Sequence, residues 1–230
     1  DLLASPADSI WMFVETRLRS AAWLELIPMS VAFALIGIAF GLLFGRYATA
    51  LKSSQDRVQW LEHELNLSLP SLVALGENER LEFKSTLRWD LKERCTNKTL
   101  ENVIAKSIAG LMNHRGGSLI IGVADNGDVI GIGADCQTLR HKNIDGFERA
   151  LMDVVRKSLG AHACTLIHCQ FPYLGDEQVC RLIIEPSVVP IFIQHGGTAH
   201  YVVRTGNSTR ELDAREAHAH VEQRNAEARR

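Results

Sequence analysis

The chain has 230 residues, of which 46% are hydrophobic and 23% are charged. This composition excludes a disordered chain and predicts one folded domain with an additional segment. The formal net charge of −2 means that nucleic-acid binding would need a local basic patch. The five cysteines are odd in number and form no CxxC pair, which favours a reducing compartment over a disulfide framework.

Residues 1–25 combine large apolar residues such as Trp11 and Phe13 with Arg17 and Arg19. We expect an amphipathic helix at a membrane interface, or else an extracytoplasmic arm or the end of an earlier span. The chain begins with Asp1 rather than Met, so we also expect that it is processed or a fragment of a longer protein.

The stretch from Leu26 to Gly45 contains no charged residue. An apolar run of this length predicts a helix that crosses the membrane once. A cleaved signal peptide is the main alternative, but the preceding segment is not basic and Arg46 interrupts the run before a cleavage-like Ala-Thr-Ala. The basic residues after the span place the C-terminal part in the cytoplasm.

Two patterns in this region predict self-association. Gly37, Gly41 and Gly45 recur at every fourth position, a spacing that lets two membrane helices approach closely. Residues 46–69 then predict a juxtamembrane helix with an apolar heptad seam, formed by Leu51, Val58 and Leu65. We expect a homo-oligomer, although isolated glycines and a helix that packs on its own domain would give the same patterns.

Residues 71–222 predict an α+β domain, followed by a tail at 223–230. Apolar periodicity predicts helices that start near Asn97 and span 144–159, with a last helix over 213–223. Alternating or continuous apolar runs predict strands at 80–84, 118–124, 129–132, 163–170, 178–185, 191–193 and 200–204. In the strand at 80–84, alternation is expected to send Leu81 and Phe83 to one face, and Glu82 and Lys84 to an open face.

Three carboxylates flank these strands: Glu77 and Glu82 at the first, and Asp125 after the strand at 118–124. Clustered carboxylates can hold Mg²⁺ or Mn²⁺, which activates water and neutralises phosphodiester charge. Taken alone, Asp125 is equally an ordinary turn residue, and Glu82 with Lys84 an ordinary surface pair. Basic residues near them could contact phosphate, with Trp89 available for stacking: Lys84, Arg88, Lys92, Arg94 and Lys98.

The stretch from Tyr201 to Leu212 contains a second candidate phosphate contact. Arg204 and Arg210 bracket the segment Thr-Gly-Asn-Ser-Thr, whose amides and hydroxyls could grip a phosphate between two guanidinium groups. The alternative is a structural turn whose polar side chains satisfy the local backbone.

Several motifs together resemble the Schlafen-type AlbA-like domain over roughly residues 71–222. They are Leu-Glu-Phe-Lys-Ser at 81–85, Asn-His-Arg-Gly-Gly at 113–117, Ile-Gly-Val-Ala-Asp-Asn-Gly at 121–127, Val-Ile-Gly at 129–131 and the stretch at 201–212. The resemblance implies a compact nucleic-acid-binding domain. Glu77, Glu82 and Asp125 match the metal-binding catalytic acids of animal Schlafen ribonucleases, which cleave transfer and ribosomal RNA.

Two functions follow as expectations from this resemblance. The first is a membrane-anchored, metal-dependent endoribonuclease that acts on structured RNA such as tRNA. The second is a non-catalytic nucleic-acid-binding, sensing or membrane-assembly module. The animal enzymes combine two such lobes with a zinc-finger element, whereas this chain has one lobe, so an RNA clamp would require a dimer.

Overall fold

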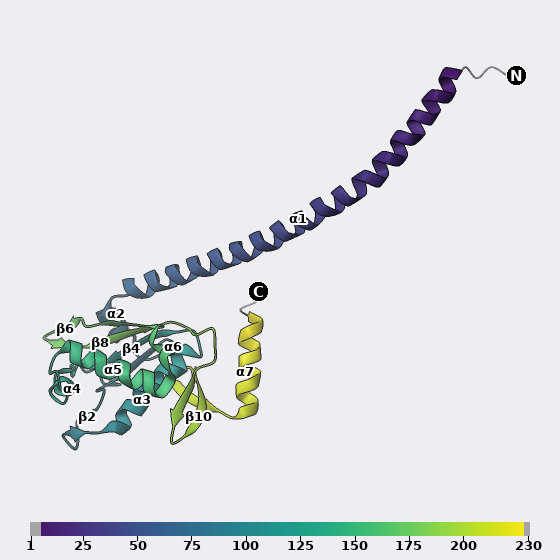
Figure 1. Cartoon of the computed structure of the whole chain (residues 1–230). Coiled ribbons are helices and arrows are strands. Elements are labelled where there is room, and N and C mark those ends of the chain that lie inside the picture. The colour runs from purple at the N-terminus through teal and green to yellow at the C-terminus, as the bar shows by residue number, and fades with distance from the viewer. Residues whose placement is uncertain (1–5, 228–230) are drawn as a thin grey trace. The chain divides into compact units, whose positions relative to one another are not determined.

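The computed structural model describes residues 6–227 of the chain (Figure 1). The expectations for residues 1–5 and 228–230 lie outside this range. The chain divides into two compact units, of which the first ends at Trp60 and the second begins at Leu61. Each is described by itself.

The described part of the first unit lies within one helix, α1 (Pro6–Asn66). From residue 6 on, the three predicted segments form one continuous helix, which ends before the predicted residue 69. Pro28 lies inside it. The stretch Pro28–Asn66 contains an 18-residue window with a mean hydropathy of 2.0 that is exposed throughout, and it is long and apolar enough to cross a membrane. Phe33, Leu43 and Phe44 are each at least 66% exposed, a surface that water alone does not favour.

The second unit is built on a four-stranded sheet with the order β1-β4-β8-β5, which confirms the predicted α+β class. The strands are β1 (Leu81–Lys84), β4 (Gly117–Ile121), β8 (Cys180–Ile184) and β5 (Ile167–Gln170). β1 runs parallel to β4, and the other neighbouring pairs are antiparallel. Gly117 lets β4 begin close to β1, since a Cβ there would lie 2.1 Å from the carbonyl oxygen of Arg80.

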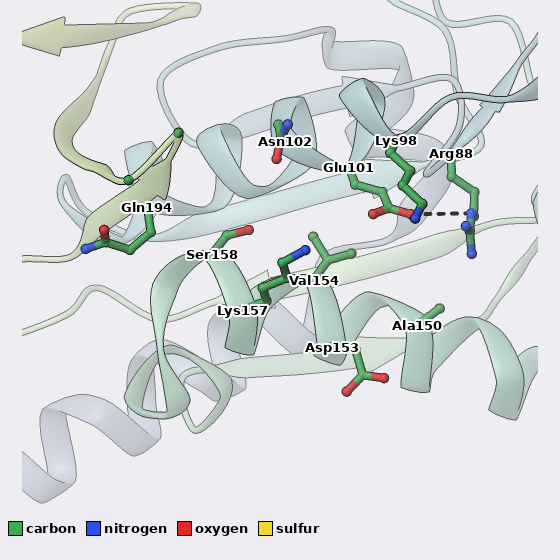
Figure 2. Close-up of a pocket in the computed structure, with 12 residues that line it drawn as sticks. Arg88, Lys98, Glu101, Asn102, Ala150, Asp153, Val154, Lys157, Ser158 and Gln194 are labelled. Carbon is green, nitrogen blue, oxygen red and sulfur yellow. Dashed lines mark ion pairs between the residues drawn. The ribbon is translucent and has the colours of Figure 1, made fainter.

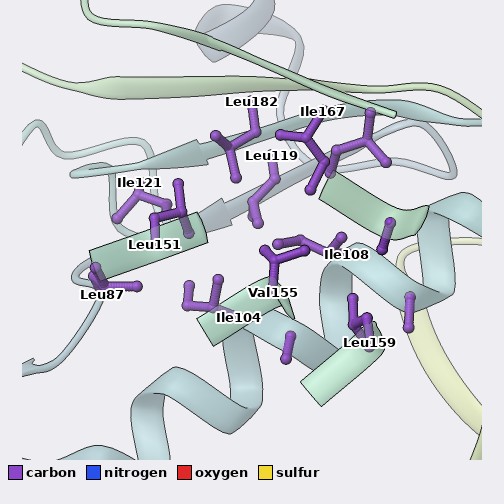
Figure 3. Packing of buried hydrophobic residues seen from close by; sticks show 14 of the residues in the cluster. Leu87, Ile104, Ile108, Leu119, Ile121, Leu151, Val155, Leu159, Ile167 and Leu182 are labelled. Carbon is purple, nitrogen blue, oxygen red and sulfur yellow. The ribbon is translucent and has the colours of Figure 1, made fainter. Parts of the chain in front are cut away.

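One face of the sheet is covered by two long helices, α3 (Lys98–Met112) and α5 (Ile144–Leu159). Ile104 and Ile108 from α3 and Leu151 from α5 pack against Leu119 and other sheet residues, as Figure 3 shows. Both helices begin where their polar caps predict: the side chain of Asn97 accepts a hydrogen bond from Thr99 N, and that of Asn143 from Gly146 N. Periodicity and the polar start at Asn97 predicted α3, whereas apolar periodicity alone predicted the start of α5.

The opposite face of the sheet is covered by the short helix α2 (Leu69–Leu75). Its residues Leu69 and Leu72 form a small core with Leu81 and Phe83 of β1. The chain enters this face from the end of α1, where the buried Arg181 of β8 donates hydrogen bonds to the carbonyl oxygens of Glu64 (2.7 Å) and Leu67 (2.9 Å). The folded unit therefore starts before residue 71, the boundary predicted from the sequence.

A second sheet, with the order β11-β10-β9, contacts α3. Its strands are β9 (Phe192–His195), β10 (Thr198–Thr205) and β11 (Ser208–Leu212), and the helix α7 (Ala214–Glu227) follows, so most of the predicted tail at 223–230 is helical. Two short ribbons pair β2 (Trp89–Asp90) with β3 (Cys95–Thr96), and β6 (Tyr173–Leu174) with β7 (Glu177–Gln178). Two single-turn helices, α4 (Gly133–Gln137) and α6 (Ala161–Cys164), complete the unit.

Three predicted strands differ from the structure, and the one at 118–124 ends already at Ile121 in β4. Residues 129–132 form no return strand; a single bridge joins Val123 to Val129. The reason is Gly122, whose φ of 102° turns the chain out of the sheet, and whose carbonyl oxygen accepts hydrogen bonds from both Ile130 N and Gly131 N. The predicted strand at 163–170 begins only at Ile167, because α6 occupies its first residues.

Candidate nucleic-acid interface

The carboxylates of Glu77 and Glu82 both approach the ammonium group of Lys84. The distance from Lys84 Nζ to Glu82 Oε1 is 2.7 Å, and to Glu77 Oε1 it is 4.0 Å. Glu77 also receives a hydrogen bond of 2.8 Å from the amide of Phe83. The structure therefore brings two of the three predicted acids together around one lysine.

Glu82 is buried rather than on an open face, which corrects the sequence prediction. It is 7% exposed, and its neighbour across β4 is Leu119, a residue of the main core. Helix α3 covers this face, and Ser107 of α3 donates a hydrogen bond of 3.3 Å to Glu82 Oε1. Strand alternation correctly separated Leu81 and Phe83 from Glu82, but both faces of β1 are covered by helices.

Arg204 of β10 is the second cation that contacts Glu82. Contrary to the prediction from the sequence, its guanidinium is buried and not accessible to a phosphate. Its side chain is 1% exposed, and its guanidinium pairs with Glu82 Oε2. The same guanidinium donates hydrogen bonds to the carbonyl oxygens of Asn78 (2.9 Å) and Leu81 (3.2 Å). Arg204 thus joins the second sheet to the start of β1 from inside the domain.

Asp125 lies on the surface, in the turn that follows β4. Because β1 and β4 are parallel, Lys84, which ends β1, and Asp125, which follows β4, belong to the same end of the two strands. In the part of the chain that the structure describes, no group of three or more His, Cys, Asp or Glu side chains is placed to hold a metal ion. Both oxygens of Glu82 contact cations of the protein itself, so the arrangement does not fit Mg²⁺ or Mn²⁺, and we derive no catalytic step through a metal.

A polar pocket of about 590 Å³ opens between α3, α5 and the loop that joins β9 to β10 (Figure 2). Arg88 and Lys98 extend from one wall and Lys157 from α5 on another. Its lining residues are Arg88, Lys98, Glu101, Asn102, Ala150, Asp153, Val154, Lys157, Ser158, Gln194, Gly196 and Gly197. Of the basic residues predicted to contact phosphate, Arg88 and Lys98 line this pocket.

The two acids of the pocket are already paired with arginines. Glu101 Oε1 lies 3.4 Å from Arg88 Nε, and Asp153 Oδ1 lies 2.8 Å from Arg156 Nη2. In contrast, no ion pair or hydrogen bond among the side chains that the structure describes engages the ammonium groups of Lys98 and Lys157, and both side chains are exposed. The pocket therefore offers two uncompensated positive charges, which favour an anionic ligand.

Asp135 fixes the backbone that carries Arg88, and sequence reasoning missed it. Its carboxylate accepts hydrogen bonds from the amides of Leu87 (2.8 Å), Arg88 (2.8 Å) and Trp89 (2.7 Å). The side chain is fully buried, and this burial raises the pKa of Asp135, while the three amides oppose that shift. Its sequence context, the single-turn helix α4, carries no local signal of this role.

Asp90 organises the ribbon β2–β3 beside the pocket. Its Oδ1 accepts hydrogen bonds from the amides of Lys92 (3.0 Å) and Glu93 (3.1 Å), and its Oδ2 accepts one from Asn97 Nδ2 (3.1 Å). These contacts, that of Glu93 foremost, lower the pKa of Asp90. The ribbon therefore presents the exposed side chain of Lys92, one of the predicted nucleic-acid contacts, on a defined turn.

Arg210 is exposed on β11, as its predicted role requires. It pairs across the hairpin with Val203, while Thr209 faces α3. There the hairpin packs so closely on Gly110 that a Cβ at that position would lie 2.6 Å from Thr209 Cγ2. The predicted phosphate loop is thus a hairpin turn with one arginine inside the domain and one outside.

Comparison with known proteins adds three findings. No curated protein matches the chain. The crystal structure of the DIP2311 protein from Corynebacterium diphtheriae is similar over 63% of this chain, with 17% sequence identity and a TM-score of 0.45. The chain spans only 29% of that protein's length, and so distant a likeness indicates neither ligand nor activity. The family described as Schlafen, AlbA_2 matches residues 77–213, which is more than half of the chain, and the chain therefore belongs to this family.

Proposed function

We propose that this protein holds a nucleic-acid-binding domain at a membrane. The observation that carries the proposal is the pocket between α3 and α5, in which Lys98 and Lys157 have no acidic partner among the described residues. Lysines without an acidic partner can neutralise phosphates of a nucleic acid. The counterions that the phosphates then release are the main source of binding affinity. Membership of the Schlafen, AlbA_2 family supports the same class of ligand.

The charges of the domain favour this pocket over the predicted site around Lys84. The Lys84 ammonium contacts Glu82 and also donates a hydrogen bond of 2.6 Å to the carbonyl oxygen of Phe83. Arg204 is buried on the other oxygen of Glu82. We therefore assign phosphate contacts to Lys98 and Lys157 in the pocket, which Arg88 also lines, with Lys92 and Arg210 as exposed contacts outside it.

Membrane anchoring is the second part of the proposal, and it rests on the exposed apolar stretch within Pro28–Asn66. The orientation expected from the basic residues that follow the span places the domain in the cytoplasm, where nucleic acid is present. A second copy of the chain would cover the exposed Leu51, Val58 and Leu65, and the open space around Gly37, Gly41 and Gly45 would admit its helix. A homo-oligomer would then bring several binding domains together.

A binding titration of the full chain in detergent micelles tests the proposal. Affinity for labelled RNA and DNA should fall linearly with the logarithm of salt concentration. Lys157→Ala should reduce the salt slope by about one, since it removes one phosphate contact. Lys142→Ala is the matched control, because Lys142 is an exposed lysine outside the pocket lining. Absence of salt-dependent binding to both nucleic acids would refute the proposal.

Metal-dependent cleavage of RNA is the second candidate function. It is favoured by the convergence of Glu77 and Glu82 on Lys84, with Asp125 following the adjacent parallel strand, and it would require Lys84 and Arg204 to release the oxygens of Glu82 before a metal could bind there. Asp125→Asn is the informative variant, because this exposed side chain can lose its charge without disturbing the fold. If the family's catalytic acids act here, wild type should cleave tRNA in Mn²⁺ and Asp125→Asn should not, whereas the exposed control Asp176→Asn should.

A further inference from the structure

We propose that the pocket between α3 and α5 receives one unstacked nucleotide, so that the protein prefers single-stranded or looped nucleic acid over a regular duplex. This inference rests on the proposed nucleic-acid binding and names the form of nucleic acid that is bound. The pocket's cavity of about 590 Å³ is of the size that encloses small ligands, for which volumes of about 300–1,000 Å³ are common. A stacked and paired base cannot enter such a cavity, whereas a splayed-out base can.

The walls of the pocket supply each kind of contact that a single nucleotide needs. Lys98 and Lys157 reach in from different helices and can hold the phosphate. The carboxamides of Asn102 and Gln194 offer donors and acceptors to the edge of a base, which is how side chains read unpaired bases. Ala150 and Val154 of α5 provide the apolar surface against which a base can lie.

Arg88 completes the pocket as a held, planar group. Its side chain is paired with Glu101 at 3.4 Å, and its backbone is fixed by the buried carboxylate of Asp135. The carbonyl oxygen of Arg88 also accepts a hydrogen bond of 2.7 Å from Asn97 N at the start of α3. Because the Arg88 residue is fixed at its backbone and paired at its guanidinium group, the guanidinium can stack on a base without losing much further conformational freedom.

The arrangement favours a nucleotide over a bare phosphate or a carboxylate ligand. An inorganic anion would use the two lysines alone and leave the carboxamides and the apolar surface of α5 uncovered. Both acids in the wall are neutralised by arginines, so they do not repel a phosphate. The combination of cations, carboxamides and apolar surface matches the three parts of a nucleotide.

The experiment uses the full chain in micelles and oligonucleotides that carry 2-aminopurine, a base whose fluorescence rises when it unstacks. A single strand and its blunt duplex of the same sequence are titrated, each in RNA and in DNA form. The variants Asn102→Ala and Gln194→Ala remove the base contacts. Asn102 lies in α3, where alanine is a strong helix former, so the fold should persist. Asn225→Ala, on the exposed surface of α7, is the matched control.

We expect the single strand to bind more tightly than the duplex, with brightening of one 2-aminopurine. Asn102→Ala should weaken single-strand binding by about fivefold, the usual effect of losing one hydrogen bond, and reduce the brightening, while duplex binding stays unchanged. The RNA and DNA arms identify the sugar; a preference for either one agrees with the proposal as long as the pocket variants weaken it.

Three outcomes would overturn the inference. Equal binding of single strand and duplex without brightening would refute the unstacked nucleotide but leave nucleic-acid binding intact. Brightening that persists in both Asn102→Ala and Gln194→Ala would place the unstacked base elsewhere. No binding of any oligonucleotide would refute the inference together with the proposed function.

Discussion

Replacement of Glu82 by glutamine should destabilise the domain by about 3–5 kcal/mol, the usual cost of leaving a buried charge without its partner. Arg204, whose side chain is 1% exposed, would keep its hydrogen bonds to Asn78 and Leu81 but lose the only carboxylate that it contacts among the described residues. Lys84 would lose the same partner, but its side chain is 22% exposed and can turn to water at a cost below about 1 kcal/mol. The destabilisation therefore comes from Arg204.

Glu77→Gln is the matched control for this prediction. It makes the same chemical change in the other predicted acid, but a glutamine oxygen can still accept the hydrogen bond from Phe83 N. The Glu77 side chain is 20% exposed and lies 4.0 Å from Lys84, so its loss of charge should cost less than about 1 kcal/mol.

Thermal unfolding of the full chain in micelles, followed by proteolysis of the unfolded domain, measures both effects. At about 2–4 °C per kcal/mol, Glu82→Gln should lower the midpoint by roughly 6–20 °C, and Glu77→Gln by a few degrees at most. Midpoints that agree for wild type and Glu82→Gln would contradict the structural role that we assign to Glu82. They would support a carboxylate that serves only in catalysis.

Three further predictions concern the frame of the domain. Deletion of residues 1–70 should unfold or strongly destabilise the domain, because the buried Arg181 loses its acceptors on Glu64 and Leu67 and keeps only Ser118 Oγ among the described residues. Deletion of residues 1–60 should not have this effect, and thermal midpoints of the two fragments compare them. Asp135→Asn should cost about 1–3 kcal/mol, because a carboxamide cannot accept all three amides, and should weaken RNA binding through Arg88; urea titration and binding assays measure the two effects. Folding lowers the pKa of Asp90, so the ionised carboxylate stabilises the ribbon fully at pH values above its ordinary pKa of 3.8, and this stabilisation is lost as the pH falls through the lowered pKa. Amide exchange at Lys92 should therefore accelerate at low pH, and Asp90→Asn should remove this pH dependence.

The elements that sequence reasoning predicted correctly are those with local signals. Helices α3 and α5 each combine an apolar stripe with an asparagine cap, and α5 ends at Gly160, whose φ is 92°. These signals lie within a few residues of the element that they define, so one sequence is enough to read them. β1 and β4 were recognised in the same way, by alternation and by a continuous apolar run.

Sequence reasoning missed Asp135 and assigned Arg204 a different role, because the contacts of both residues join distant parts of the chain. Asp135 accepts amides that lie 46 to 48 positions earlier, and Arg204 contacts carbonyl groups that lie 123 and 126 positions earlier. No spacing rule relates such residues before the fold is known. The prediction that Glu82 lies on an open face failed for the same reason, since alternation shows which residues share a face but not whether another element covers that face.

The position of Lys84 explains why the family motif and the proposed ligand contacts fall on different residues. Its ammonium stands between the carboxylates of Glu77 and Glu82, and it also donates to the carbonyl oxygen of Phe83. If Lys84 contacted a phosphate, its ammonium group would have to turn away from Glu82, and the negative charge of Glu82 beside α3 would be less fully compensated. Lys98 and Lys157 carry no such obligation among the described residues, so a phosphate gains their charge at no cost to the fold. The motif residues of β1 thus stabilise the domain, while lysines that belong to no motif remain free to bind.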